Sequence, residues 1–250
     1  KIIFLIDGLE DVLTMVPQSE IEQEAVKVLC QDIVAQLMAK YPNLGIIIFV
    51  RKDLVQSSIK VNFKQFEQTN GQSELRWSSS EALRLVLWLV SKADKGFYKG
   101  SVEIDNASQK VIDENLIALW GAKLGRPSSN EAYSSRWILA ALSDFNGQLQ
   151  ARDIIRFLKY ASIEPKKVPY NDRIIMPSEI RSAVSTCSKE KIEEVKQEYS
   201  ALKPILEKLE KLPADQKKLP LSVEHAQLTN DEEKHMIQEG YLKREGDKYY

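Results

Sequence analysis

Cysteine and histidine are scarce in this sequence of 250 residues, which holds two of each. Cys30 and Cys187 stand far apart, and neither has a second cysteine or a histidine beside it. A structural zinc site needs about four such ligands, so this pattern argues against one. The low cysteine number fits a reducing compartment, and we therefore expect a cytoplasmic protein.

Long apolar runs and an excess of charge are also missing. No apolar stretch reaches the roughly 18 residues of a membrane-spanning helix, and the longest candidate, residues 83–90, contains Arg84. No basic segment followed by an apolar one marks a signal peptide. The formal net charge is −1, and such a balance favours neither nucleic acid nor a membrane surface as partner.

A glycine-rich phosphate loop is the third absence. The sequence contains no Gly-x-x-x-x-Gly-Lys-Ser/Thr, and the nearest glycine pair, Gly96 and Gly100, has Lys99 in the wrong position. The backbone and lysine that cradle nucleotide phosphates in P-loop enzymes are therefore not encoded in these residues.

Two apolar runs each end in charged residues. Residues 1–6 lead into Asp7, and residues 46–50 lead into Arg51. Continuous apolar runs are typical of strands buried on both faces of a parallel sheet. Acidic residues at the carboxyl end of such a strand lie where α/β sheets bind their ligands.

Residues 19–40, between these runs, have apolar positions on one helical face. Ser19 and Glu22 have the spacing of a capping box at the start of that helix. The order strand, helix, strand predicts a βαβ unit with a right-handed crossover.

The rest of the chain predicts mainly helices. A third short strand is expected at residues 74–77, a loop at 94–108 and a linker at 163–173. A glycine turn predicts a hairpin over residues 241–250. Helices are expected at residues 81–92, 111–123, 132–142, 149–161, 177–199, 204–212 and 230–239.

Residues 2–11, Ile-Ile-Phe-Leu-Ile-Asp-Gly-Leu-Glu-Asp, resemble the Walker B motif of the STAND branch of AAA-like P-loop ATPases. The family motif usually ends Asp-Glu, whereas this sequence has Glu10 followed by Asp11. Further segments are similar to that family in the same order: residues 46–51 (sensor 1 strand, with Val50 where Ser or Thr is common), 75–82 (next strand and helix start), 139–158 (lid helices) and 147–155 (sensor 2).

The resemblance implies a role for each charged residue. Asp7 would hold magnesium through water, and Glu10 or Asp11 would position the attacking water. Arg51 and Arg152 would contact the γ-phosphate, with Arg136 and Arg156 as alternatives to Arg152. Taken without the resemblance, Asp7 and Gly8 are a common turn pair, and Arg51 is an ordinary arginine at a strand end, either solvated or ion-paired.

The resemblance implies an α/β fold class: a partial P-loop NTPase parallel sheet with a helical lid, followed by a winged-helix-like C-terminal module. The expected domains are residues 1–108 (C-terminal half of the NTPase core), 109–162 (lid) and 163–250 (winged-helix-like module). The Walker A loop would precede Lys1. We therefore expect the C-terminal portion of an ATP-binding, ATP-hydrolysing switch ATPase. On this reading only the longer protein binds ATP and magnesium, and these 250 residues alone are inactive.

The alternative is a non-catalytic protein-interaction or regulatory module. Residues 162–250 hold sixteen basic and seventeen acidic side chains, which is not the basic footprint of a nucleic-acid domain. If the module contacts DNA, we expect the contact through the wing residues Lys243, Arg244 and Lys248. The expected partner is a protein or a second copy of the chain, because an unpaired sheet edge favours association.

Overall fold

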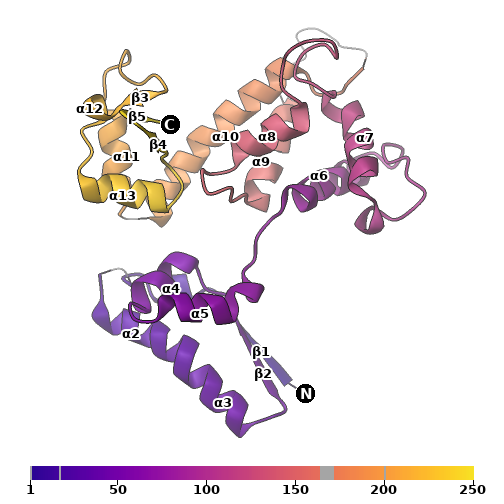
Figure 1. Ribbon diagram of the computed structural model, residues 1–250. Helices are drawn as coiled ribbons and strands as arrows, with labels where there is room; N and C mark the ends of the chain where they lie inside the picture. Colours follow the sequence, from indigo (N-terminus) through magenta and orange to yellow (C-terminus); the bar gives the residue numbers. More distant parts are fainter. Residues whose placement is uncertain (1, 17, 164–171, 200) are drawn as a thin grey trace. The chain divides into compact units, whose positions relative to one another are not determined.

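The computed structural model describes residues 2–16, 18–163, 172–199 and 201–250. The chain divides into two compact units, Lys1–Leu75 and Arg76–Tyr250. This division lies well before the boundary expected at residue 108, because the helix that follows residue 78 packs with the later helices (Figure 1). Most of the linker expected at 163–173 lies outside the described residues.

The first unit contains a parallel pair of strands joined through helices. Strand β1 (Ile2–Ile6) pairs with β2 (Leu44–Ile48), with Ile2 opposite Leu44 and Ile6 opposite Ile48. The helical connection expected at 19–40 is confirmed as α2 (Glu20–Val28), a π-helical turn (Leu29–Ile33) and α3 (Val34–Lys40). The remaining elements are α1 (Leu9–Val12), α4 (Lys52–Ser58), α5 (Phe63–Asn70) and a 3₁₀ turn (Gly71–Ser73).

The cap of α2 differs from the sequence prediction in one bond. The Glu22 amide donates to the Ser19 hydroxyl oxygen at 3.3 Å, as expected. The Glu22 carboxylate, however, accepts from the Met15 amide at 2.8 Å. This bond ties the segment before the helix to its first turn, beside a small core of Val16, Val26 and Leu54.

The prediction that β1 is buried on both faces is wrong. The side chains of Ile2, Ile3, Phe4 and Leu5 are between 55% and 65% exposed. The third strand expected at 74–77 is also wrong, since the described chain has no strand there. The described part of the sheet therefore has only two strands, and the side chains that a wider sheet would cover face solvent.

This exposed strand predicts concentration-dependent self-association. Unpaired strand edges with apolar side chains offer a template for a second chain. We expect Leu5→Lys to weaken association at least about ten-fold in sedimentation velocity, since a charge on an edge strand opposes pairing. Ile21→Lys is the matched control, because Ile21 is 84% exposed but lies on α2. Equal association of both variants would contradict a sheet-mediated contact.

The second unit begins with a helical bundle. Its helices are α6 (Ser79–Ala93), α7 (Gln109–Trp120), α8 (Ser134–Leu142), α9 (Ala151–Ile163) and α10 (Pro177–Glu198), with a 3₁₀ turn at Ile104–Asn106. Ser78 caps α6 in a complete capping box with Glu81. Trp120 and Phe157 lie in the bundle core with ring centroids 6.5 Å apart.

The end of the second unit has its own apolar core. Its elements are α11 (Lys203–Glu210), β3 (Leu221–Ser222), α12 (Val223–Ala226), α13 (Asn230–Gln238), β4 (Arg244–Glu245) and β5 (Lys248–Tyr249). The hairpin expected over 241–250 is confirmed as β4–β5, and β3 pairs with β5 to give the antiparallel order β3-β5-β4. We call this part the C-terminal module.

None of the helices in the described residues is long and apolar enough to cross a membrane.

Candidate nucleotide site

The carboxyl ends of β1 and β2 carry the charged residues singled out in the sequence. Because the strands are parallel and in register from Ile2 to Ile6, Asp7 and Arg51 follow the strands at the same end of the sheet. Ligands of α/β sheets bind at this end. The geometry of the first unit thus places these residues at the end of the sheet where α/β proteins bind ligands.

Asp7 is an exposed carboxylate at the start of a tight turn. Its Oδ1 accepts a hydrogen bond from the Gly8 amide at 2.9 Å. Gly8 has φ 75°, a left-handed conformation that glycine adopts without the clash of a Cβ. This turn leads from β1 directly into α1 and leaves the Asp7 side chain open to solvent.

Glu10 and Asp11 lie in the single turn of α1, and Asp11 is the more exposed of the two. Among the described residues no three His, Cys, Asp or Glu side chains form a group that could hold a metal ion. Magnesium needs no such cage when nucleotide phosphates and water supply most of its ligands. The single Asp7 carboxylate therefore fits a water-mediated magnesium contact but does not by itself make a metal site.

Arg51 is held by a neighbouring carboxylate. Its Nε donates to Asp53 Oδ1 at 3.1 Å and its Nη2 to Asp53 Oδ2 at 2.9 Å. Such a bidentate pair is short and directional. To contact a phosphate, the guanidinium would have to exchange this partner or share it.

Arg152 belongs to the second unit and is also ion-paired. Its guanidinium contacts Glu194, and it contacts Glu198 at 3.4 Å. Of the alternatives, Arg136 is exposed on α8, and Arg156 lies in the same network as Arg152, on α9. Neither Arg152 nor Arg156 presents an unoccupied guanidinium to a ligand.

The sequence interpretation missed the network that these arginines form with α10. Arg156 contacts Asp153 at 3.1 Å, Glu190 at 3.1 Å and Glu194 at 2.7 Å. The signal was present in the spacing: Arg152 and Arg156 are four residues apart, and so are Glu190, Glu194 and Glu198. Residues four apart share a helix face, so the basic face of α9 was complementary to the acidic face of α10.

Comparison of this chain with protein-family models, with curated proteins and with solved structures gives no match in any of the three.

Proposed function

We propose that this chain is the C-terminal portion of a switch ATPase similar to the STAND branch of AAA-like P-loop enzymes. The observation that carries the proposal is the parallel β1–β2 pair, which has Asp7 and Arg51 at the carboxyl ends of its strands. An apolar strand followed by Asp, beside a parallel strand followed by Arg, resembles the Walker B and sensor 1 strands of such ATPases, whose Walker B Asp holds magnesium.

The residue roles follow from charge and position. Asp7 would hold magnesium through water, and Glu10 or Asp11 would orient the attacking water. Arg51, released from Asp53, would contact the γ-phosphate. Arg152 would have to leave Glu194 and Glu198 before it could bind any phosphate. The chemistry that magnesium supplies when bound with ATP is neutralisation of charge on the phosphates.

Exposure of β1 supports the same proposal. A strand with Ile2, Ile3, Phe4 and Leu5 more than half exposed has apolar surface that further strands or helices would cover. A P-loop domain would supply these neighbours and the phosphate loop together. Without that loop we expect the 250 residues alone to bind ATP weakly and not to hydrolyse it.

The order of elements in the C-terminal module supports a winged-helix-like assignment. Helix α11, strand β3, helices α12 and α13 and the β4–β5 hairpin follow one another, with β3 paired to β5. The first turn of α13 carries Asp231, Glu232 and Glu233, which would repel a phosphate backbone. We therefore propose that the module contacts protein and does not read DNA.

The test is ATP hydrolysis by the polypeptide that the complete reading frame encodes. We expect that polypeptide to contain Gly-x-x-x-x-Gly-Lys-Ser/Thr and to lose at least about ten-fold in rate in Asp7→Asn. Asp32→Asn, an exposed carboxylate of the same unit, is the matched control. Comparing Glu10→Gln with Asp11→Asn then identifies the carboxylate that positions water. A reading frame without the loop, or an unchanged rate in Asp7→Asn, would contradict the proposal.

The second candidate is a non-catalytic interaction module. It is favoured by the ion pairs of Arg51 and Arg152, which occupy both guanidiniums proposed to contact phosphate. In that case Arg51 and Asp53 stabilise the start of α4, and the acidic face of α13 makes the functional contact. A full-length polypeptide that binds no ATP but binds a basic protein through α13 would support this candidate.

A further inference from the structure

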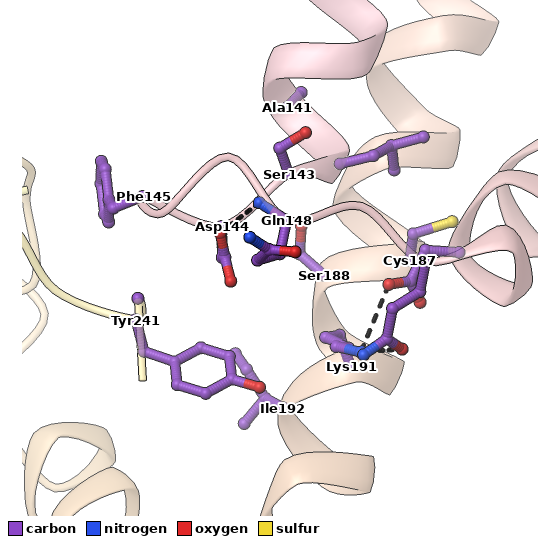
Figure 2. A pocket seen from close by; sticks show the side chains of 14 residues that line it. Ala141, Ser143, Asp144, Phe145, Gln148, Cys187, Ser188, Lys191, Ile192 and Tyr241 are labelled. Atoms are coloured by element: carbon purple, nitrogen blue, oxygen red, sulfur yellow. Dashed lines mark hydrogen bonds and ion pairs between the residues drawn. The ribbon is translucent and has the colours of Figure 1, made fainter. Parts of the chain in front are cut away.

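A cavity of about 280 Å³ lies within the second unit, where the helical bundle meets the C-terminal module. Figure 2 shows that its walls come from the loop after α8, from α10 and from the segment after α13. We call it the junction pocket and define it by Leu142, Asp144, Gln148, Lys191, Ile192 and Tyr241.

Direct hydrogen bonds across the junction fix the walls of the pocket. The Phe145 amide donates to the Gly240 carbonyl at 2.9 Å, and Asn146 Nδ2 donates to the Gln238 carbonyl at 3.0 Å. Gly240 has φ 75°, and a Cβ there would lie 2.9 Å from the Asp144 carboxyl carbon. The close approach of these segments means that the pocket is already formed without a ligand.

Asp144 is a carboxylate of the pocket that makes no direct ion pair in the described residues. Its Oδ1 accepts from the Gln148 amide at 2.7 Å. Burial raises the pKa of the carboxyl group, and the backbone amides and the more distant charge of Lys191 partly oppose this rise. Within the described part of the chain, no lysine or arginine forms an ion pair with Asp144. Lys191, on the facing wall, contacts Gln150 Oε1 at 2.7 Å and Asp153 at 3.3 Å instead.

The pKa of the Tyr241 phenol is raised by burial and by negative charge nearby. Burial raises its pKa first, and the neighbouring Tyr199 and the carboxylates of Glu239, Asp144 and Glu198 raise it further. Negative charge around the phenol opposes its ionisation. Lys191, which also lines the pocket, is paired with Asp153 and Glu194, so the carboxylate of Asp144 is the group to which a bound cation would be attracted.

The remaining walls are largely apolar. Leu142, Ile192 and the Tyr241 ring line the pocket, and Figure 2 shows Tyr241 and Ile192 close together. The volume of about 280 Å³ lies just below the range of about 300–1,000 Å³ that is usual for ligand pockets. It suits a short hydrocarbon chain with one charged end rather than a nucleotide.

We propose that the junction pocket binds a small molecule that carries a primary ammonium group on a short hydrocarbon body. The ammonium donates charge-assisted hydrogen bonds to Asp144 and lies near the Tyr241 ring, which attracts cations through its π face. The hydrocarbon body packs against Leu142 and Ile192. Because the walls belong to the bundle and to the C-terminal module, the ligand stabilises their contact as it binds.

The test uses pentylamine as probe, with pentan-1-ol as the uncharged control. In ¹H–¹⁵N spectra of the 250-residue chain, we expect pentylamine to shift the Gln148 and Gly240 amides with saturation and a Kd on the order of 1 mM. Pentan-1-ol should bind at least about ten-fold more weakly, since it cannot pair with a carboxylate.

Two variants separate the role of charge from the role of space. Asp144→Asn can still accept from the Gln148 amide, and we expect it to weaken pentylamine binding at least about ten-fold. Asp94→Asn is the control, because Asp94 makes a similar bond to the Gly96 amide at 2.9 Å, in the loop after α6. Ser188→Trp adds bulk from the exposed side of α10 and should abolish binding without touching Asp144.

Equal affinity for the amine and the alcohol would overturn the proposal. Unchanged pentylamine binding in Asp144→Asn would also overturn it. If Asp144→Asn does not fold, unchanged binding in Ser188→Trp would overturn it. Absence of saturable shifts at about 50 mM pentylamine, far above the expected Kd, would also refute it.

Discussion

Replacing Arg173 with Ala is expected to lower the free energy of unfolding of the second unit by about 3–5 kcal/mol. The Arg173 side chain is only 1% exposed and donates to the carbonyl oxygens of Lys123 at 2.7 Å and Gly125 at 3.1 Å. It also contacts the Trp120 carbonyl at 3.4 Å. Alanine would remove this donor from the Lys123 and Gly125 carbonyls, while the Trp120 carbonyl keeps a bond from the Ser134 hydroxyl at 3.1 Å. It would also create a cavity beneath the segment that follows α7.

The Arg173 guanidinium lies against the backbone of Gly121, in the space that a Cβ would occupy. Gly121 has φ 75°, and a Cβ built there would lie 2.2 Å from the Arg173 Cζ atom. A side chain at position 121 would therefore collide with the guanidinium and would also strain the backbone. The arginine and the glycine form one unit, which explains why the expected loss is larger than that of an ordinary hydrogen bond.

Urea unfolding followed by tryptophan fluorescence measures this effect in the second unit alone. The four tryptophans, Trp77, Trp88, Trp120 and Trp137, all follow the division at Leu75. Arg136→Ala is the control, since Arg136 is exposed, and its change should stay within about 0.5 kcal/mol. Arg173→Lys should give an intermediate loss, because an ammonium cannot match the fork of donors. A loss below about 1 kcal/mol in Arg173→Ala would contradict the assigned role.

Arg173 also illustrates what the sequence could not predict. It lies in the segment interpreted as a linker, because prolines and a lysine pair surround it. Asp172, its ion-pair partner, is adjacent, but the carbonyl oxygens to which it donates lie about fifty residues earlier in the chain, and no local pattern connects them to Arg173. Helix starts, by contrast, depend on neighbouring residues. Three serines at positions 78–80 precede the expected helix 81–92, and the structure shows that Ser78 is the cap of α6.

The sheet shows the same contrast between local and distant causes. The pairing of β1 with β2 follows from two apolar runs and one helix, all close in sequence. The burial of β1 depends on which segments cover it, and here Leu5 is 65% exposed. Strand β3 was missed because its two residues form a strand only through pairing with β5.

For the charged residues of the candidate site, the sequence predicted the positions along the chain but not the ion-pair partners. The positions of Asp7 and Arg51 at one end of the sheet followed from the strand pattern. Their partners did not, because the choice of Asp53 for Arg51 depends on side-chain geometry at the start of α4. For Arg152, the acidic residues of α10 lie more than forty positions later, and only the four-residue spacing on both helices pointed to the contact.

Replacing Arg156 with Met is expected to destabilise the second unit by about 2–4 kcal/mol at pH 7. The Arg156 side chain is 16% exposed and contacts three carboxylates, of which Asp153 is 9% and Glu194 13% exposed. Methionine keeps the apolar stem of the side chain but removes the positive charge that pairs with these carboxylates. Lys191 still contacts Asp153 and Glu194, which limits the loss.

The pH dependence of this loss separates charge from packing. Burial alone would raise the pKa of Glu194, but the hydrogen bond from Arg156 and the nearby Lys191, Arg152 and Arg156 charges hold it below its usual value. A depressed carboxyl pKa gives stability that is present above the unfolded pKa and is lost as pH falls through the folded pKa. In Arg156→Met, Glu194 loses the hydrogen bond and charge that hold its pKa down, so the difference between variant and wild type should shrink from pH 7 to pH 4. Urea unfolding at both pH values tests this, with Arg181→Met as control, because Arg181 is about half exposed and pairs with the exposed Glu131.

A difference that stays constant between pH 7 and pH 4 would mean that Arg156 acts through packing and not through charge.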